Sequence, residues 1–149
     1  MHNPSNNGND HLHDIFWAKS LAIVGASTDP NKLGNLILRN VVEGGYSGEI
    51  FPVNPKAKEV HGLKAYSSIT NIPSAVDLLI FVIPAKFIPE MMQAAKAKGV
   101  KGCVVISGGF REAGNEELEA RLLEEAKKSD IRIIGPNCQG FNFRPNQLC

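Results

Sequence analysis

Residues 21–27 read Leu21-Ala22-Ile23-Val24-Gly25-Ala26-Ser27, and the rest of the chain is organised around them. Four apolar residues in a row, two of them β-branched, predict a buried strand that stops at Gly25. After a turn of small and polar residues, apolar side chains recur with the spacing of one helix face, at Leu33, Leu36, Ile37 and Val41. The first N–H groups of a helix have no partner within it, so a strand, a glycine turn and a helix start together favour anion binding. We therefore expect this turn to hold the diphosphate of a nucleotide-containing cofactor.

The bulk properties are those of an ordinary globular protein of one domain. The 149 residues are 43% hydrophobic and 21% charged, with a net charge of +1. So small a charge gives no electrostatic case for binding nucleic acid or an anionic membrane surface. No apolar run approaches the ~18 residues that cross a bilayer, and the N-terminus has no signal-peptide pattern. Three irregularly spaced cysteines argue against a disulfide framework, so we expect a cytoplasmic protein.

The first 13 residues are polar and predict a flexible N-terminal tail, which leaves residues 14–149 as the folded domain. His2, His11 and His13 lie in this segment, but a polar tail gives metal ligands no fixed geometry and no supporting contacts. We therefore predict no metal site. Residues 15–17 are expected to pack as a short lead-in over the edge of the first strand.

Apolar runs and helical patterns alternate along the rest of the chain. Further strands are predicted at 49–53, 77–83, 101–106 and 131–134, with a minor extended piece near 64–66. Helices are predicted after Lys32, after Pro84 and over 115–128. This alternation, with short loops, predicts an α/β fold with a mostly parallel sheet. The loops that follow the strands then share one edge, where such folds bind ligands.

The turn after the first strand matches neither common nucleotide-binding pattern. Ser27 stands where G-x-G-x-x-G needs its second glycine, and no Gly-Lys-Ser/Thr is present for a P-loop. The second strand ends in Val53-Asn54-Pro55-Lys56, with a lysine where an NAD-binding fold needs an acid. A cation there suits the 3′-phosphate of coenzyme A (CoA) or the 2′-phosphate of NADP. Lys56 as a solvated loop lysine is the alternative.

Six short motifs resemble the CoA-binding domain of NDP-forming acyl-CoA synthetases, the group of ADP-forming acetyl-CoA synthetase and the succinyl-CoA ligase α subunit. They stand in the family's order over about residues 15 to 145, at 23–27, 52–56, 76–78, 83–85, 107–112 and 135–140. The resemblance implies a Rossmann-like, doubly wound CoA-binding domain. It further implies that coenzyme A is the cofactor and that the remaining synthetase domains or subunits are partners.

The same resemblance implies a role for each motif along the CoA molecule. It places the diphosphate at Gly25, Ala26, Ser27 and Lys32, and the adenosine 3′-phosphate end at Pro52, Val53 and Lys56. It places the pantetheine path at Ile83, Pro84 and Ala85. The thiol end and the border of the reaction centre would be formed by Ser107, Gly108, Gly109, Phe110, Glu112, Asn137, Cys138 and Gly140. The alternatives are a plain turn for the two glycines, a core position for Phe110 and a small buried residue for Cys138.

In the family a histidine of a following domain carries phosphate, and an ATP-grasp module binds the nucleotide. Neither is found in this sequence, and His61 matches no catalytic position. We therefore expect no catalytic residue and no synthetase activity from this chain alone. An NADP-binding reductase-like domain and a non-enzymatic interaction subunit are the competing interpretations.

Overall fold

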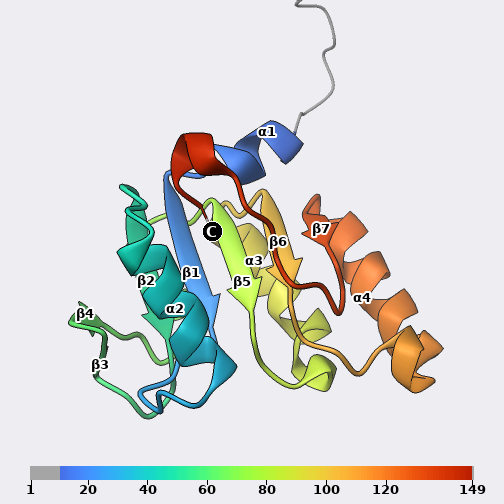
Figure 1. Ribbon diagram of the computed structural model, residues 1–149. Coiled ribbons are helices and arrows are strands. Elements are labelled where there is room, and N and C mark those ends of the chain that lie inside the picture. Colours follow the sequence, from blue (N-terminus) through green and yellow to red (C-terminus); the bar gives the residue numbers. More distant parts are fainter. Residues whose placement is uncertain (1–10, 149) are drawn as a thin grey trace, which may run out of the picture.

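The computed structural model describes residues 11–148, with the side chain of His11 excepted. Its centre is a five-stranded sheet in the order β2-β1-β5-β6-β7, in which every neighbouring pair is parallel (Figure 1). The strands are β1 (Ser20–Val24), β2 (Glu49–Val53), β5 (Leu78–Phe81), β6 (Gly102–Val105) and β7 (Arg132–Ile134). A small antiparallel pair, β3 (Glu59–Val60) and β4 (Leu63–Lys64), stands apart from this sheet. The predicted α/β fold with a parallel sheet is confirmed.

Helices cover both faces of the sheet, and the strands are mostly apolar for that reason. The helices are α1 (His11–Phe16), α2 (Leu33–Glu43), α3 (Met92–Ala97) and α4 (Glu116–Ser129). Along β1, Leu21 and Ile23 join the core on the α2 side, whereas Ala22 and Val24 join the core beneath α3 and α4. Each strand therefore buries alternate side chains against different helices.

The predicted apolar face of α2 is confirmed at Val41 and, in part, at Ile37, but it is wrong at Leu33 and Leu36. Leu33 is 50% exposed and Leu36 is 38% exposed, while Gly34, Asn35, Leu38 and Val41 are buried. The helix turns Gly34 inward because its backbone packs against the turn after β1, where a side chain would collide. Two leucines of α2 are left on the surface as a result.

Two other predicted elements differ in detail. The segment after Pro84 is not one helix but two 3-10 turns, Ala85–Phe87 and Pro89–Met91, followed by α3. The lead-in segment is helix α1, and it packs on β6 rather than on the edge of β1, which lies inside the sheet. Ile15 fills the space over Gly102, where an added Cβ would lie 2.3 Å from the isoleucine side chain.

Helix α1 begins at His11, so residues 11–13 of the expected tail are helical; residues 1–10 lie outside the described residues. None of the helices within 11–148 combines the length and the apolar character needed to cross a membrane.

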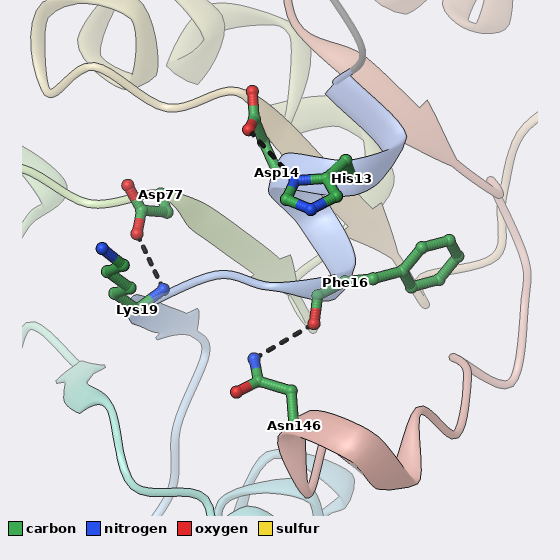
Figure 2. Close-up of polar contacts among 6 residues, drawn as sticks. All are labelled: His13, Asp14, Phe16, Lys19, Asp77 and Asn146. Carbon is green, nitrogen blue, oxygen red and sulfur yellow. Dashed lines mark hydrogen bonds and ion pairs between the residues drawn. The ribbon is translucent and has the colours of Figure 1, made fainter. Parts of the chain in front are cut away.

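The two ends of the described chain meet at the amino edge of the sheet. The Asn146 amide donates to the carbonyl of Phe16 at 3.0 Å, and Asp77 accepts the Lys19 N–H at 2.8 Å (Figure 2). The same amide also donates to the carbonyl of Ala18 at 3.0 Å. The Phe16 ring stacks on Phe143 with 5.1 Å between centroids. This closure at the amino edge leaves the carboxyl edge to the loops.

Candidate functional site

A cleft of about 520 Å³ opens at the carboxyl edge of the sheet, beyond the ends of β1, β2 and β5. This volume lies within the range of small-molecule sites. The sheet order reverses its direction at β1, and parallel α/β sheets bind ligands at such a switch point. The walls are residues 24–27 with Lys32, residues 53–55, residues 67–70, residues 82–84, and Phe87, Met91 and Ala94.

Close backbone packing shapes the turn after β1. Gly25 has φ +101°, and a Cβ added there would lie 2.4 Å from the carbonyl oxygen of Val82. A Cβ added at Gly34 would lie 1.9 Å from the carbonyl oxygen of Gly25. Only glycine fits both positions, so the first turn of α2 starts directly against the end of the strand.

Two asparagines hold the same turn from its sides. Asn54 donates to the carbonyl of Ala26 at 2.7 Å, and Asn35 donates to the carbonyl of Ser27 at 2.8 Å. The prediction did not include these residues in the site. An asparagine next to a glycine in the first helical turn is the signal that was available for Asn35, and the prediction from apolar spacing did not use it.

The hydrogen bonds of the turn decide which groups are left for an anion. The Gly25 N–H donates to Val53 at 3.1 Å and the Ala26 N–H donates to Ile23 at 3.4 Å, so these two amides are engaged. The start of α2 has no side-chain cap, and Lys32 occupies its N-cap position. Lys32 lines the cleft, so a cationic residue and the partial positive charge of the helix start lie together at its border.

The end of β2 contributes one wall of the cleft. Of the three residues predicted there, only one lines the cleft. Val53 lines the cleft, together with Asn54 and Pro55. Pro52 is buried within β2, and its carbonyl accepts the Tyr66 N–H at 2.9 Å. Lys56 is exposed outside the lining, and its backbone N–H donates to Asn54 Oδ1 at 2.8 Å. The same contact between β2 and Tyr66 brings residues 67–70 to the cleft, a wall that the sequence did not indicate.

From the cleft, the remaining predicted loops follow one another along the carboxyl edge. Ile83 and Pro84 line the cleft, and Ala85 is buried behind them. A Cβ added at Gly109 would lie 3.3 Å from that of Ala85, which places the 107–110 loop alongside. A Cβ added at Gly108 would lie 3.1 Å from both Asn137 Oδ1 and Glu112 Oε1. The motifs after β1, β5, β6 and β7 thus form one continuous row.

Within the 107–112 loop, the carboxylate of Glu112 binds backbone. Its Oε1 accepts the Gly109 N–H at 2.5 Å and the Phe110 N–H at 3.2 Å. The hydrogen bond from Gly109 lowers the pKa of Glu112 below its usual value, with that from Phe110 adding to it. The Phe110 side chain is fully buried in the core, which favours the alternative that the sequence left open for it.

The loop after β7 carries Asn137 and Cys138. Asn137 has φ +52°, and its N–H donates to the carbonyl of Ser107 at 3.1 Å. The half-buried Cys138 thiol lies 3.4 Å from the carbonyl oxygen of Val105. Cys103, in contrast, is fully buried, and burial raises the pKa of its thiol to about 12.

The described residues hold no group of three or more His, Cys, Asp or Glu side chains that would suit a metal ion. What the carboxyl edge offers is a cleft with a positive end and a long rim of glycine-rich loops. Such a site suits an elongated ligand that is anionic at one end.

Comparison with known proteins identifies relatives. The family described as CoA binding domain matches residues 19–144. ADP-forming acetate–CoA ligase II of Archaeoglobus fulgidus is 47% identical over 131 residues, which is 87% of this chain and 20% of that protein. Subunit alpha of ADP-forming acetate–CoA ligase I of Pyrococcus furiosus is 42% identical over 143 residues, 92% of this chain and 31% of that protein.

A solved structure agrees with these sequence relatives. The dinucleotide forming acetyl-coenzyme A synthetase 1 of Ca. Korarchaeum cryptofilum, in complex with phosphate and ADP, has a TM-score of 0.87 and 38% identity to this chain. The match covers 95% of this chain and 30% of that one. The chain therefore spans between 20% and 31% of the length of these three relatives.

Proposed function

This chain belongs to the family of CoA binding domains, and we propose that its carboxyl-edge cleft holds CoA or an acyl-CoA. The resemblance found in the sequence motifs, and coenzyme A as the cofactor that goes with it, agree with this family. The observation that carries the proposal is the continuity between the cleft at Lys32 and the row of loops that ends at Asn137.

The ligand is proposed to lie along this row with its phosphates at the positive end. The diphosphate faces Ser27, Lys32 and the start of α2, while Gly25 and Ala26 allow it to approach closely. Lys56 reaches the 3′-phosphate from outside the cleft. The pantetheine arm passes Ile83 and Pro84 toward Gly108, Gly109 and Asn137, so that the thiol arrives near Cys138.

We further propose that the chain is the CoA-binding part of an NDP-forming acyl-CoA synthetase, a ligase that joins an acid to the CoA thiol. The names of its relatives support this, since both are ADP-forming acetate–CoA ligases. Other domains or subunits of that enzyme supply the nucleotide and phosphoryl chemistry. The exposed Leu33 and Leu36 on α2 are suited to a contact with them.

Isothermal titration calorimetry with CoA, dephospho-CoA and NADPH tests the proposal. We expect CoA to bind with 1:1 stoichiometry, dephospho-CoA to bind more weakly because it lacks the 3′-phosphate, and NADPH to give no heat. An absence of heat with CoA would contradict the proposed function. Tighter binding of NADPH than of CoA would favour a reductase-like domain instead.

A further inference from the structure

We propose that Glu112 is a positioning residue, which acts on the pantetheine arm of CoA by fixing the 107–110 loop rather than by touching the ligand. The inference rests on the proposed function. The carboxylate of Glu112 would thus act on the pantetheine end of CoA, whereas Lys32 and the start of α2 act on its phosphates.

The carboxylate of Glu112 accepts its hydrogen bonds from backbone amides. A single oxygen, Oε1, accepts two successive amides, those of Gly109 at 2.5 Å and Phe110 at 3.2 Å. Two adjacent N–H groups converge on one point only when the backbone between them curls, and Gly109 provides the curl with φ +110°. The carboxylate therefore selects one conformation of a residue that would otherwise have several.

Gly108 explains how the carboxylate comes so close to the loop. A Cβ added there would stand 3.1 Å from Glu112 Oε1 and 3.1 Å from Asn137 Oδ1, so the glycine leaves both polar groups against the backbone. The 107–110 loop is thus in contact with Glu112, which follows it in the chain, and with Asn137, in the loop after β7.

Other contacts anchor other groups of the loop, and the Asn137 N–H donates to the carbonyl of Ser107 at 3.1 Å. The Asn115 side chain donates to the carbonyl of Gly109 at 2.9 Å, and the Phe110 ring is buried in the core. These contacts maintain the fold of the segment, whereas Glu112 is exposed and adds nothing to the core. The N–H groups of Gly109 and Phe110 are the part of the loop that depends on the carboxylate.

The position of this loop links it to one end of the ligand. Gly109 lies against Ala85, directly after Pro84 in the cleft wall, and away from Lys32 and the helix start where the phosphates are proposed to bind. Loosening the loop should therefore affect the pantetheine arm and leave the phosphorylated adenosine untouched.

The experiment compares CoA with adenosine 3′,5′-bisphosphate, which has the nucleoside and its phosphates without the pantetheine arm. We expect Glu112→Ala to weaken CoA binding roughly five- to thirtyfold, the factor for ordering one more backbone residue at binding. Affinity for the bisphosphate should stay within about twofold of wild type. Glu112→Gln, whose amide oxygen can accept the same two N–H groups, should restore most of the CoA affinity.

Glu117→Ala is the matched control, because Glu117 is an exposed acid in the first turn of α4 and its removal changes the net charge equally. It should leave both affinities unchanged. Should Glu112→Ala fail to fold, Glu112→Asp tests the same reach, since it keeps the charge and shortens the side chain by one methylene group.

Equal weakening of both ligands by Glu112→Ala, or no weakening of either, would overturn the positioning role. If the wild-type protein binds neither CoA nor the bisphosphate, the proposed function fails instead, and the two failures are thereby told apart.

Discussion

Lys56 is the residue for which we propose a contact with the 3′-phosphate of CoA. It follows Asn54 and Pro55, which line the cleft after the end of β2. Its backbone N–H donates a hydrogen bond to the side chain of Asn54. The side chain itself is exposed and free to reach a phosphate at the mouth of the cleft.

We expect Lys56→Ala to weaken CoA binding by about 1.5–3 kcal/mol, the value of a charge-assisted hydrogen bond to phosphate. Binding of dephospho-CoA should not change, because it lacks the phosphate concerned. Calorimetry with both ligands measures the difference, and Lys58→Ala in the same exposed loop serves as the control. Equal losses for both ligands would assign Lys56 to another part of the molecule.

Tyr46 gives the fold a dependence on alkaline pH. Its hydroxyl donates to the carbonyl of Ala18 at 2.8 Å. Burial, followed by the negative charges of Asp77 and Glu49, raises the pKa of Tyr46 from 10.0 to about 12. Between these values the unfolded chain loses the phenolic proton while the folded chain keeps it, so folding stability falls as pH rises.

Stability from Tyr46 should be fully present below pH ~10 and lost by pH ~12, with a difference of about 2–3 kcal/mol over that range. Urea denaturation of wild type and Tyr46→Phe at a series of pH values isolates this contribution, since other groups titrate in both proteins. Parallel curves for the two proteins from pH 9 to 12 would show that Tyr46 does not titrate in this way.

At the scale of elements, α2 and β1 are joined by the contact between Gly34 and the Gly25 carbonyl. In most helices an alanine in place of a glycine adds about 1 kcal/mol of stability. Here the new methyl group would lie 1.9 Å from a backbone oxygen, so the helix has to move away from the strand.

We therefore expect Gly34→Ala to destabilise the fold by about 1–3 kcal/mol, the cost of overpacking, and to weaken CoA binding as the helix start shifts. Chemical denaturation and calorimetry measure the two effects. Asn40→Ala, at an exposed position of the same helix, should be neutral or slightly stabilising. A gain in stability for Gly34→Ala would refute the close contact.

This contact also explains which features the sequence could predict. The five strands were found because each is a local apolar run, and their parallel order follows from the intervening helices. The first turn of α2 was predicted wrongly, because Gly34 and Asn35 turn inward to meet Gly25 and Ser27, and the spacing of apolar residues carries no information about such backbone contacts.

The candidate site shows the same division. Residues 25–27, 53 and 83–84 were predicted from the family resemblance of motifs at the ends of strands, and these strand ends do meet at one cleft. The wall at 67–70 carries no local signal, since it comes to the cleft only through the pairing of Tyr66 with β2. That Val53 lines the cleft and Pro52 does not likewise depends on the tertiary structure, because adjacent residues of a strand point to opposite sides.

At the scale of the whole molecule, the amino edge acts as a clasp between residues 16–18 and 141–148. Asn146 provides two of its hydrogen bonds, both to backbone carbonyls more than a hundred residues away in sequence. Because the ligand is proposed at the opposite edge, stability and binding should respond separately to changes there.

Asn146→Ala should lower the free energy of unfolding by about 1–2 kcal/mol through the loss of these bonds, with the affinity for CoA unchanged. Urea denaturation and calorimetry on the same preparation measure both quantities. Asn142→Ala, an exposed position of the same segment, is the control and should alter neither. A parallel loss of affinity would mean that the clasp and the cleft are coupled.

The pairing of Tyr66 with β2 has a consequence for how the protein behaves in crowded solution. An open sheet normally presents two rims of unpaired backbone groups on which other chains can assemble into aggregates. Here Pro52 has no N–H to offer, and its carbonyl already binds Tyr66. At the other rim β7 is only three residues long and carries the exposed Arg132. Within residues 11–148 the pairing with Tyr66 occupies the end of one rim, and the short, charged β7 makes the other a weak template for intermolecular strand addition.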